Sequence, residues 1–151
     1  MTGAMHMVAA EQPRTPRRWG ATIKASPTTV SMARRRVRTV LEEWGLESER
    51  AHDLVVICSE LVTNAIRHAS QEGDEVGLRL QEIDGGCRIE VLDSRPDLSL
   101  PKTSSPHGEN GRGLILVREL ADGMDVVTTC TTKKVQARVL LAAKDTSRSI
   151  P

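Results

Sequence analysis

Apolar residues recur with a helical period in three stretches of the chain. The first stretch follows Ser26-Pro27, which is typical of a helix start, and its apolar positions are 30, 33, 37, 40, 41 and 44. This pattern predicts a helix that ends at Gly45. A second helix is predicted from a Ser48 cap to about Ala69, and a third from Leu114 to Ala121.

Other stretches alternate apolar and polar residues and therefore predict strands. Residues 76–80 and 87–91 alternate on either side of Asp84-Gly85-Gly86, which indicates a hairpin. A short strand is predicted over Trp19–Ala25, and a second hairpin over Met124–Cys130 and Val135–Ala142 around Thr131-Thr132-Lys133-Lys134. Helices that segregate from hairpins predict an α+β fold: a two-layer α/β sandwich with a mainly antiparallel or mixed sheet and the helices on one face.

The length of 151 residues leaves room for one domain, and a hydrophobic content of 38% is enough for a single core. We expect a flexible leader over residues 1–18, the folded domain over 19–142 and a frayed tail over 143–151. The segment from Ser94 to Asn110 has few apolar residues, which predicts an exposed, mobile loop. Because no long apolar segment or signal core is found, we expect a cytoplasmic location.

Charge and composition argue against several classes of function. The 21 basic and 20 acidic residues give a net charge of +1, so no overall field favours nucleic acid or an anionic membrane. The run Arg34–Arg36 with Arg38 fits a solvated helix face. Two Trp without Phe or Tyr leave no stacking platform for single-stranded nucleic acid. Cysteines at positions 58, 87 and 130 suggest neither a disulfide framework nor a zinc site, and Cys58 is most simply a core residue.

The second predicted helix carries the most informative polar residues. Glu60, Asn64 and His68 are four residues apart, close to one turn, so their side chains project from one stripe. On its own this stripe also fits the polar face of an ordinary amphipathic helix. A second element downstream, Gly111-Arg112-Gly113-Leu114, makes a functional site the better interpretation. The apolar residues on the opposite side of the helix are Ala51, Leu54, Val55, Cys58, Leu61, Val62, Ala65 and Ala69.

Together, the two elements resemble the nucleotide site of the Bergerat-fold (GHKL) ATPases, the superfamily of gyrase, Hsp90, histidine kinases and MutL-type proteins. The first motif of that superfamily has the form Glu-x-x-x-Asn-Ala-x-x-His. Within it, the chain most resembles the small bacterial anti-sigma-factor serine kinases, which implies the Bergerat ATP-binding fold. The resemblance runs from about Trp19 to Leu141 and includes Trp44-Gly45-Leu46, Ser59–Ala65, Gly111–Leu114 and Leu120-Ala121-Asp122.

The resemblance implies a role for each residue of the two elements. Asn64 is implied to bind Mg²⁺ beside the phosphates of ATP, and Glu60 to act as a general base toward water or a substrate hydroxyl. His68 is either a phosphate contact or an exposed side chain. Gly111 and Gly113 permit close backbone approach at the start of the Leu114 helix, whose N–H groups form an anion site, and they look like the hinge of an ATP lid. Arg112 points either at phosphate or outward.

Asp93 resembles the aspartate that accepts a hydrogen bond from the adenine amino group, which disfavours guanine because guanine presents a carbonyl there. The chain departs from the family pattern at two places nearby. Asp93-Ser94-Arg95 stands where the family has Asp-x-Gly, and Arg95 lacks the backbone freedom of glycine. Lys134 stands where relatives often carry Thr, which either removes a water-mediated contact to the base or phosphate or replaces it by a charge.

The resemblance implies an ATP-dependent serine/threonine protein kinase of anti-sigma-factor type, with ATP and Mg²⁺ as cofactors. The implied partners are a sigma factor that it sequesters and an anti-anti-sigma (STAS-type) protein that it phosphorylates. A homodimer is compatible with this resemblance, whereas direct contact with nucleic acid or a membrane is not expected. The alternative is a non-catalytic nucleotide-sensing interaction module of the same fold. Glu60 favours the kinase, and Arg95 and Lys134 favour the sensor.

Overall fold

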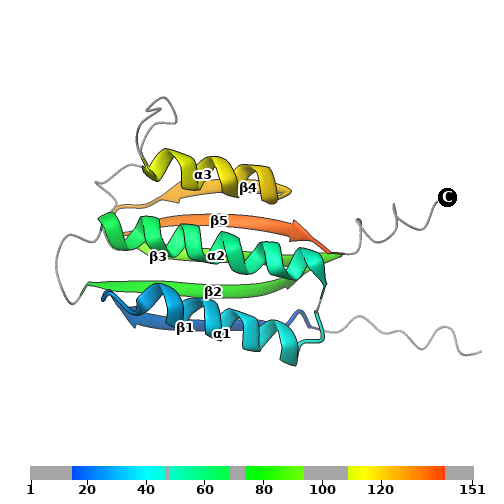
Figure 1. Ribbon diagram of the computed structural model, residues 1–151. Coiled ribbons are helices and arrows are strands. Elements are labelled where there is room, and N and C mark those ends of the chain that lie inside the picture. The colour runs from blue at the N-terminus through cyan, green and yellow to red at the C-terminus, as the bar shows by residue number, and fades with distance from the viewer. Residues whose placement is uncertain (1–14, 47, 69–73, 94–108, 142–151) are drawn as a thin grey trace, which may run out of the picture.

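The computed structural model describes residues 15–46, 48–68, 74–93 and 109–141 (Figure 1). Residues 1–14 of the expected leader, residues 94–108 of the expected loop and the expected tail over 143–151 lie outside these ranges. The elements follow in the order β1 (Arg18–Lys24), α1 (Thr29–Glu43), α2 (Glu49–His68), β2 (Glu75–Ile83), β3 (Gly86–Asp93), α3 (Glu109–Leu120), β4 (Gly123–Thr128) and β5 (Lys133–Leu140).

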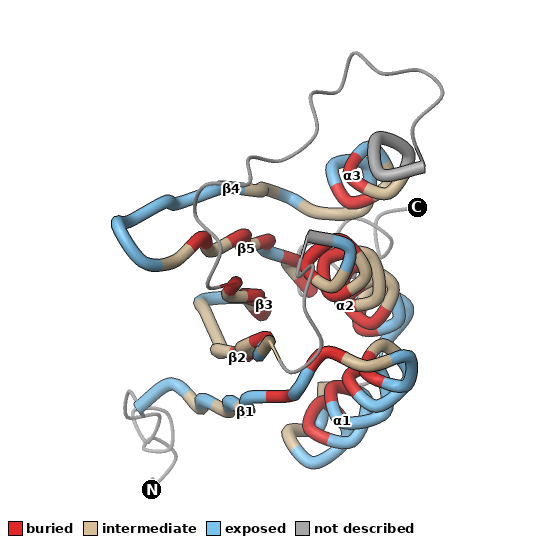
Figure 2. Tube along the Cα trace, turned by 90° about the vertical axis from the view of Figure 1, so that its left-hand side faces the viewer, coloured by how far each residue is buried: buried red, intermediate tan, exposed pale blue. Residues whose placement is uncertain are grey.

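The strands form one five-stranded sheet in the order β1-β2-β3-β5-β4, and every neighbouring pair is antiparallel. Figure 2 shows the helices together on one side of this sheet, with α2 between α1 and α3. The predicted α+β two-layer sandwich with helices on one face is therefore confirmed. The last strand, β5, lies between β3 and β4, so β4 and not β5 is at the edge of the sheet.

One apolar core lies between the two layers. Alternate residues of β2, β3 and β5 face the helices and are buried, as their period-two patterns predict. The apolar side of α2 packs onto them, and Ala69, the last member of its predicted apolar set, lies outside the described residues. The central strands contribute Val76, Leu78 and Leu80 from β2, Cys87, Ile89 and Val91 from β3, and Val135, Ala137 and Val139 from β5.

The boundaries of α1 show how local hydrogen bonds set the start of a helix. The helix begins at Thr29, so Ser26 is not its N-cap as predicted. Ser26 instead forms a turn with Thr29: its N donates to Thr29 Oγ1 at 2.8 Å, and its carbonyl accepts from Thr29 N at 3.1 Å. The predicted end is confirmed, because Gly45 has a φ of 72° and Leu46 N donates to Leu41 O at 2.9 Å, as in a glycine-terminated helix.

Two further local predictions are confirmed. Ser48 Oγ accepts a hydrogen bond from Ala51 N at 3.2 Å, which caps the first turn of α2. Asp84 and Gly85 connect β2 to β3, with Ile83 opposite Gly86 and a φ of 80° at Gly85. Glycine reaches this left-handed conformation without the steric penalty of a Cβ, so it suits the tight connection.

Two predicted boundaries in the second half of the chain are wrong. Lys133 and Lys134 belong to β5 and not to the turn, which is closed one step earlier by Thr129 N donating to Thr132 O at 2.8 Å. The third helix begins at Glu109, so the glycines lie inside it rather than before it. A helical glycine costs roughly 1 kcal/mol relative to alanine. Burial of Leu114 and Val117 against the core offsets that cost.

Candidate functional site

The polar stripe of α2 lies at the middle of the helical layer. Glu60, Asn64 and His68 follow one another along α2 with a rise of about 6 Å from each to the next. The helix packs against α1 and α3 on its sides and against β2, β3 and β5 below (Figure 2). The stripe therefore runs toward the end of the molecule where β3 finishes and β5 begins (Figure 1).

Asn64 is buried with an unsatisfied polar atom. It is 6% exposed, and within the described part of the chain its Oδ1 atom has no hydrogen-bond partner. A buried acceptor left in this state costs about 1–3 kcal/mol, so such groups are uncommon without a functional reason. A neutral amide oxygen is also a ligand that Mg²⁺ and Ca²⁺ accept. The burial and the free Oδ1 atom of Asn64 thus fit a cation ligand.

Glu60 lies against the bare backbone of α3. A Cβ placed on Gly113 would come within 3.5 Å of Glu60 Oε1 and 3.7 Å of Oε2, which is ordinary van der Waals contact. The structure therefore brings Glu60 and Gly113 together, although they are more than fifty residues apart in the sequence. Glu60 is only partly buried, so its carboxylate lies between α2 and α3 with an open side.

The first turn of α3 lies earlier in the chain than predicted, so Gly111 and Gly113 lie within the helix. Since the helix starts at Glu109, the N–H groups without a helical acceptor belong to residues 109–111, and not to Leu114. The Leu114 side chain is 2% exposed and anchors α3 in the core. The backbones of His68, Gly111 and Arg112 are helical, whereas the His68 and Arg112 side chains lie outside the described part of the structure.

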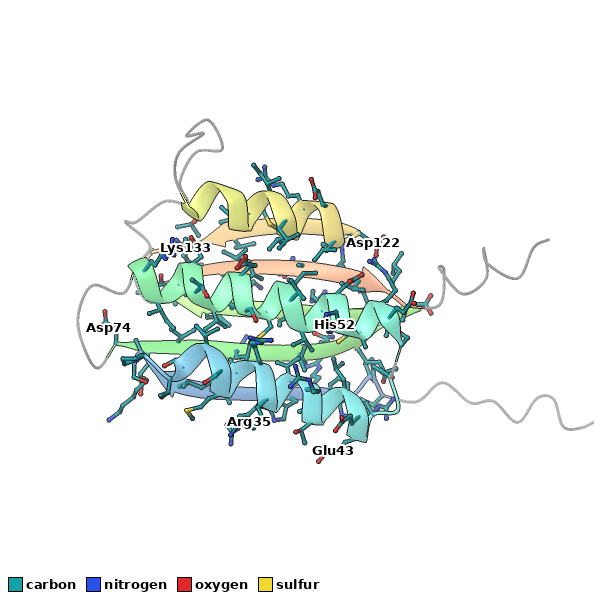
Figure 3. The ribbon with its side chains drawn as sticks, viewed as in Figure 1. Arg35, Glu43, His52, Asp74, Asp122 and Lys133 are labelled. Atoms are coloured by element: carbon teal, nitrogen blue, oxygen red, sulfur yellow. The ribbon has the colours of Figure 1, made fainter. Side chains whose placement is uncertain are left out.

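Asp93 and Lys133 form a buried, oppositely charged pair. They are direct partners in the β3–β5 register, and they are 4% and 2% exposed. Both follow the alternation of the core residues on their strands, so both face the helical layer. Burial lowers the pKa of Lys133, and the charge of Asp93 counteracts this. Figure 3 shows Lys133 at the end of the molecule where α2 ends and α3 begins.

Lys134 is not part of this pair, and of the two alternatives given for it, a lost contact or a contact replaced by a charge, its position favours the first. Its side chain lies on the open face of the sheet, where Nζ is 3.7 Å from Glu90 Oε2. Arg88 Nε is 3.4 Å from the same carboxylate atom. Arg95 lies outside the described residues. Extending the alternation of Val135, Ala137 and Val139 back by one step would have identified Lys133 as the inward residue.

Arg50 is a second residue that the sequence analysis does not identify. Its contacts give a structural reason for Leu120-Ala121-Asp122 in the family resemblance. Arg50 Nη2 is 2.6 Å from Asp122 Oδ2, and Arg50 Nη1 donates to Leu120 O at 2.9 Å. Leu140 N also donates to Asp122 Oδ2, at 2.7 Å. These contacts link the start of α2, the end of α3 and β5. The residues therefore hold the helices in place and have no direct part in the site.

The chain shares this arrangement of elements with a known family of proteins. The family of histidine kinase-like ATPase domains matches residues 23–139, and the chain belongs to this family. That span contains every strand and helix described above apart from part of β1 and the end of β5. The resemblance to Bergerat-fold ATPases drawn from the sequence is thereby confirmed.

Relatives with assigned functions are similar over most of their length. The serine-protein kinase RsbW of Oceanobacillus iheyensis is 27% identical over 118 residues, which cover 69% of this chain and 75% of the relative. The serine-protein kinase RsbW of Staphylococcus aureus is 27% identical over 134 residues, which cover 76% of this chain and 84% of the relative. The resemblance to serine kinases of this kind is therefore confirmed at the level of distant relatives.

Solved structures share the fold. The RsbU and RsbW domains of Rv1364c from Mycobacterium tuberculosis superpose with a TM-score of 0.61 at 20% identity. The match covers 83% of this chain and 32% of that one, so the chain spans about a third of it. The SiaB–SiaC complex from Pseudomonas aeruginosa superposes with a TM-score of 0.55 at 13% identity, covering 78% of this chain and 88% of the other.

Among the described helices, none is long and apolar enough to cross a membrane.

Proposed function

We propose that the chain binds Mg²⁺ and ATP between α2 and α3 and transfers the terminal phosphate to a serine or threonine of a protein partner. The observation that carries this proposal is the buried, unsatisfied Oδ1 of Asn64, one helical turn from a carboxylate that lies against α3. The membership of the ATPase family and the similarity to serine-protein kinases support it.

Each residue of the site has a role in this proposal. Asn64 would offer one oxygen to a bound Mg²⁺, an ion that keeps few protein ligands. A bound Mg²⁺ would supply neutralisation of the phosphate charge. The free N–H groups at the start of α3, near Gly111, meet the phosphates. Asp93 contacts the base. We also assign His68, Arg112, Gly113 and Leu114 to the nucleotide site, the last two through their part in shaping α3.

Glu60 acts as the general base. Its carboxylate takes the proton from the partner's hydroxyl as the oxygen–phosphorus bond forms, and the bond to the oxygen that bridges the β- and γ-phosphates breaks to release ADP. A Cβ on Gly113 would lie 3.5 Å from Glu60 Oε1, so a side chain larger than alanine at position 113 would crowd this carboxylate.

We propose that the substrate is an anti-anti-sigma (STAS-type) protein and that the chain also sequesters a sigma factor. The similarity to RsbW-type serine-protein kinases and to SiaB in its complex with SiaC supports a protein partner of this kind. We propose that the chain acts in the cytoplasm, and a homodimer is compatible with this proposal.

The second candidate function is a sensor that binds nucleotide without phosphate transfer. The observation that favours it is the buried Lys133 directly opposite Asp93, which places a positive charge beside the residue that we assign to the base. The two functions differ in one property, the transfer of phosphate to a partner.

Phosphate transfer from labelled ATP to the anti-anti-sigma proteins of the same organism tests the proposal. We expect Glu60→Gln to bind ATP about as well as the wild type and to transfer phosphate roughly 10²–10⁴-fold more slowly. Glu43→Gln, at an exposed position on α1, is the matched control and should leave both properties unchanged (Figure 3). A wild-type protein that binds ATP but labels none of these partners would reject the kinase and leave the sensor.

A further inference from the structure

The open face of the sheet, on the side away from the helices, carries a row of basic residues. No described helix covers this face in Figure 2. The row consists of direct register partners on β1, β2, β3 and β5, namely Arg18, Gln81, Arg88 and Arg138. Neighbouring strands are about 4.8 Å apart, so this basic row is roughly 14 Å long. It contains no carboxylate.

Further cations next to the basic row surround Glu90. This residue is 8% exposed although it lies on the open face. Its carboxylate is 3.8 Å from Arg79 Nη1, 3.4 Å from Arg88 Nε and 3.7 Å from Lys134 Nζ. These distances exceed those of good hydrogen bonds, and one carboxylate balances only one of three cations. Arg79 and Lys134 therefore keep N–H donors for another acceptor.

The open face is also hollowed where these cations lie. A hollow of about 530 Å³ is lined by basic side chains from four strands, namely Arg18, Arg79, Arg88 and Lys134. Beside it, Arg138 lies flat over β4, where a Cβ on Gly123 would overlap the guanidinium group. Within the described part of the chain, Arg18 and Arg138 have no ion-pair partner. The hollow and the basic row thus present positive charge that the fold does not neutralise.

We propose that the open face is a docking surface for an acidic segment of a protein partner, whose carboxylates pair with the basic row. The row is about as long as four residues of extended chain, which is too long for one small anion to span. Arginine is also the cation best suited to hold carboxylates, because its N–H groups match their geometry.

Two features favour a protein over a nucleic acid as the partner. Val127 is 43% exposed on the same face, directly opposite Lys134, and apolar contacts beside arginine are typical of protein interfaces. Glu90 and Asp125 lie on this face as well, since their register partner on β5 is Gln136 for both. These carboxylates repel a phosphate backbone, whereas a protein segment can place its charges around them.

The docking surface is independent of the nucleotide site. The sheet separates the basic row from α2, so a partner held on the open face leaves Asn64 and Glu60 accessible (Figure 2). The inference therefore does not rest on the function proposed above, and the two can fail separately.

Fluorescence anisotropy with a labelled peptide of alternating Glu and Val tests the proposal on the full chain at about 0.15 M salt. We expect the wild type to bind this peptide, and Arg18→Gln combined with Arg138→Gln to weaken it about fivefold or more, the range for two lost ion pairs. Arg35→Gln combined with Arg36→Gln is the matched control, because it removes the same charge from exposed positions of α1 in the other layer (Figure 3).

The control should change the affinity less than about twofold, because salt screens charges beyond roughly 8 Å. Equal weakening in both double variants, or a wild-type protein that does not bind the peptide, would overturn the proposal. So would a DNA oligonucleotide that binds more tightly than the peptide and is weakened by the same two substitutions, which would assign the surface to nucleic acid.

A second measurement needs no substitution. In NMR titration of the wild type, the peptide should shift amide signals of β1, β3 and β5 and leave those of α1 unchanged, and saturating Mg-ATP should alter its affinity by less than about twofold. Shifts confined to the helices, or displacement of the peptide by Mg-ATP, would overturn the inference. A protein that binds the peptide but no ATP would reject the proposed function and leave the docking surface in place.

Discussion

Asn64 combines two properties that rarely occur together in a folded protein. It is buried, and its Oδ1 atom has no hydrogen-bond partner among the described residues. Thr29 is the contrasting case, because it is equally buried but its Oγ1 donates to Lys24 O at 2.7 Å and accepts from Ser26 N at 2.8 Å. A satisfied buried polar group stabilises the fold, whereas an unsatisfied one reduces stability until a ligand pairs with it.

We therefore expect Asn64→Leu to raise the free energy of unfolding by about 1 kcal/mol in the absence of nucleotide, since a side chain with the same branching removes an unsatisfied acceptor. Thr29→Val should lower the free energy of unfolding by about 1–2 kcal/mol, because it removes a hydroxyl with two partners. Urea denaturation followed by circular dichroism measures both. Destabilisation of Asn64→Leu as large as that of Thr29→Val would mean that Asn64 has a structural role.

At the scale of single elements, α3 combines a helix start with two glycines. Gly113 has ordinary helical backbone, and alanine fits there with its Cβ in van der Waals contact with Glu60. We expect Gly113→Ala to raise the free energy of unfolding by about 0.5–1 kcal/mol, the difference in helix propensity. Gly85→Ala is the opposite control, because a φ of 80° strains any residue with a Cβ. Thermal denaturation that showed both variants less stable would contradict the helical assignment of Gly113.

The sequence predicts the type of each described element better than its ends. Periodicity identifies α2 and the β2–β3 hairpin correctly, because apolar spacing directly reflects which face is buried. It fails at Lys133, where two lysines after two threonines are typical of a turn. A tertiary contact overrides the local pattern here, because Lys133 lies opposite Asp93 and is buried there. No local pattern reveals this contact. The same applies to α3, where burial of Leu114 and Val117 extends the helix through its glycines.

At the scale of the whole molecule, two of the three cysteines are buried in the core. Burial raises the pKa of Cys58 and of Cys87 to about 12, whereas Cys130 is exposed between β4 and β5. We expect one thiol per chain to react with a maleimide in native buffer and three in denaturant, because a buried neutral thiol is unreactive. Mass spectrometry counts the adducts. A second thiol that reacts as fast as Cys130 in the native protein would contradict this core.

The raised pKa values also have a consequence for stability. The thiols of Cys58 and Cys87 are neutral in the fold up to about pH 12 but ionise near their ordinary pKa of 9.0 in the unfolded chain. The stability that the neutral buried thiols contribute is therefore complete below pH 9 and decreases as the pH rises toward 12. Replacement of Cys58 by alanine should reduce this alkaline decrease, as measured by denaturation at several pH values.

How far the site could be predicted also depends on the whole molecule. The sequence predicts Glu60 and Asn64 as one unit because helical spacing is local, and the family resemblance suggests their roles. The meeting of Glu60 with Gly113, and of Asp93 with Lys133, depends on α3 packing beside α2 and on β5 pairing with β3. Because β5 is placed between β3 and β4, these neighbours follow from sheet order, which the sequence pattern does not encode.

The central claim is that Asn64 holds Mg²⁺ beside a bound nucleotide, and calorimetric titration of ATP in Mg²⁺ and in a chelator tests it most directly. The wild-type protein should bind ATP about tenfold or more tightly with Mg²⁺, because the metal joins the phosphates to the Asn64 oxygen. Asn64→Leu, which is expected to be folded and stable, should show the same weak affinity under both conditions. The same gain in affinity from Mg²⁺ in both proteins would contradict the account.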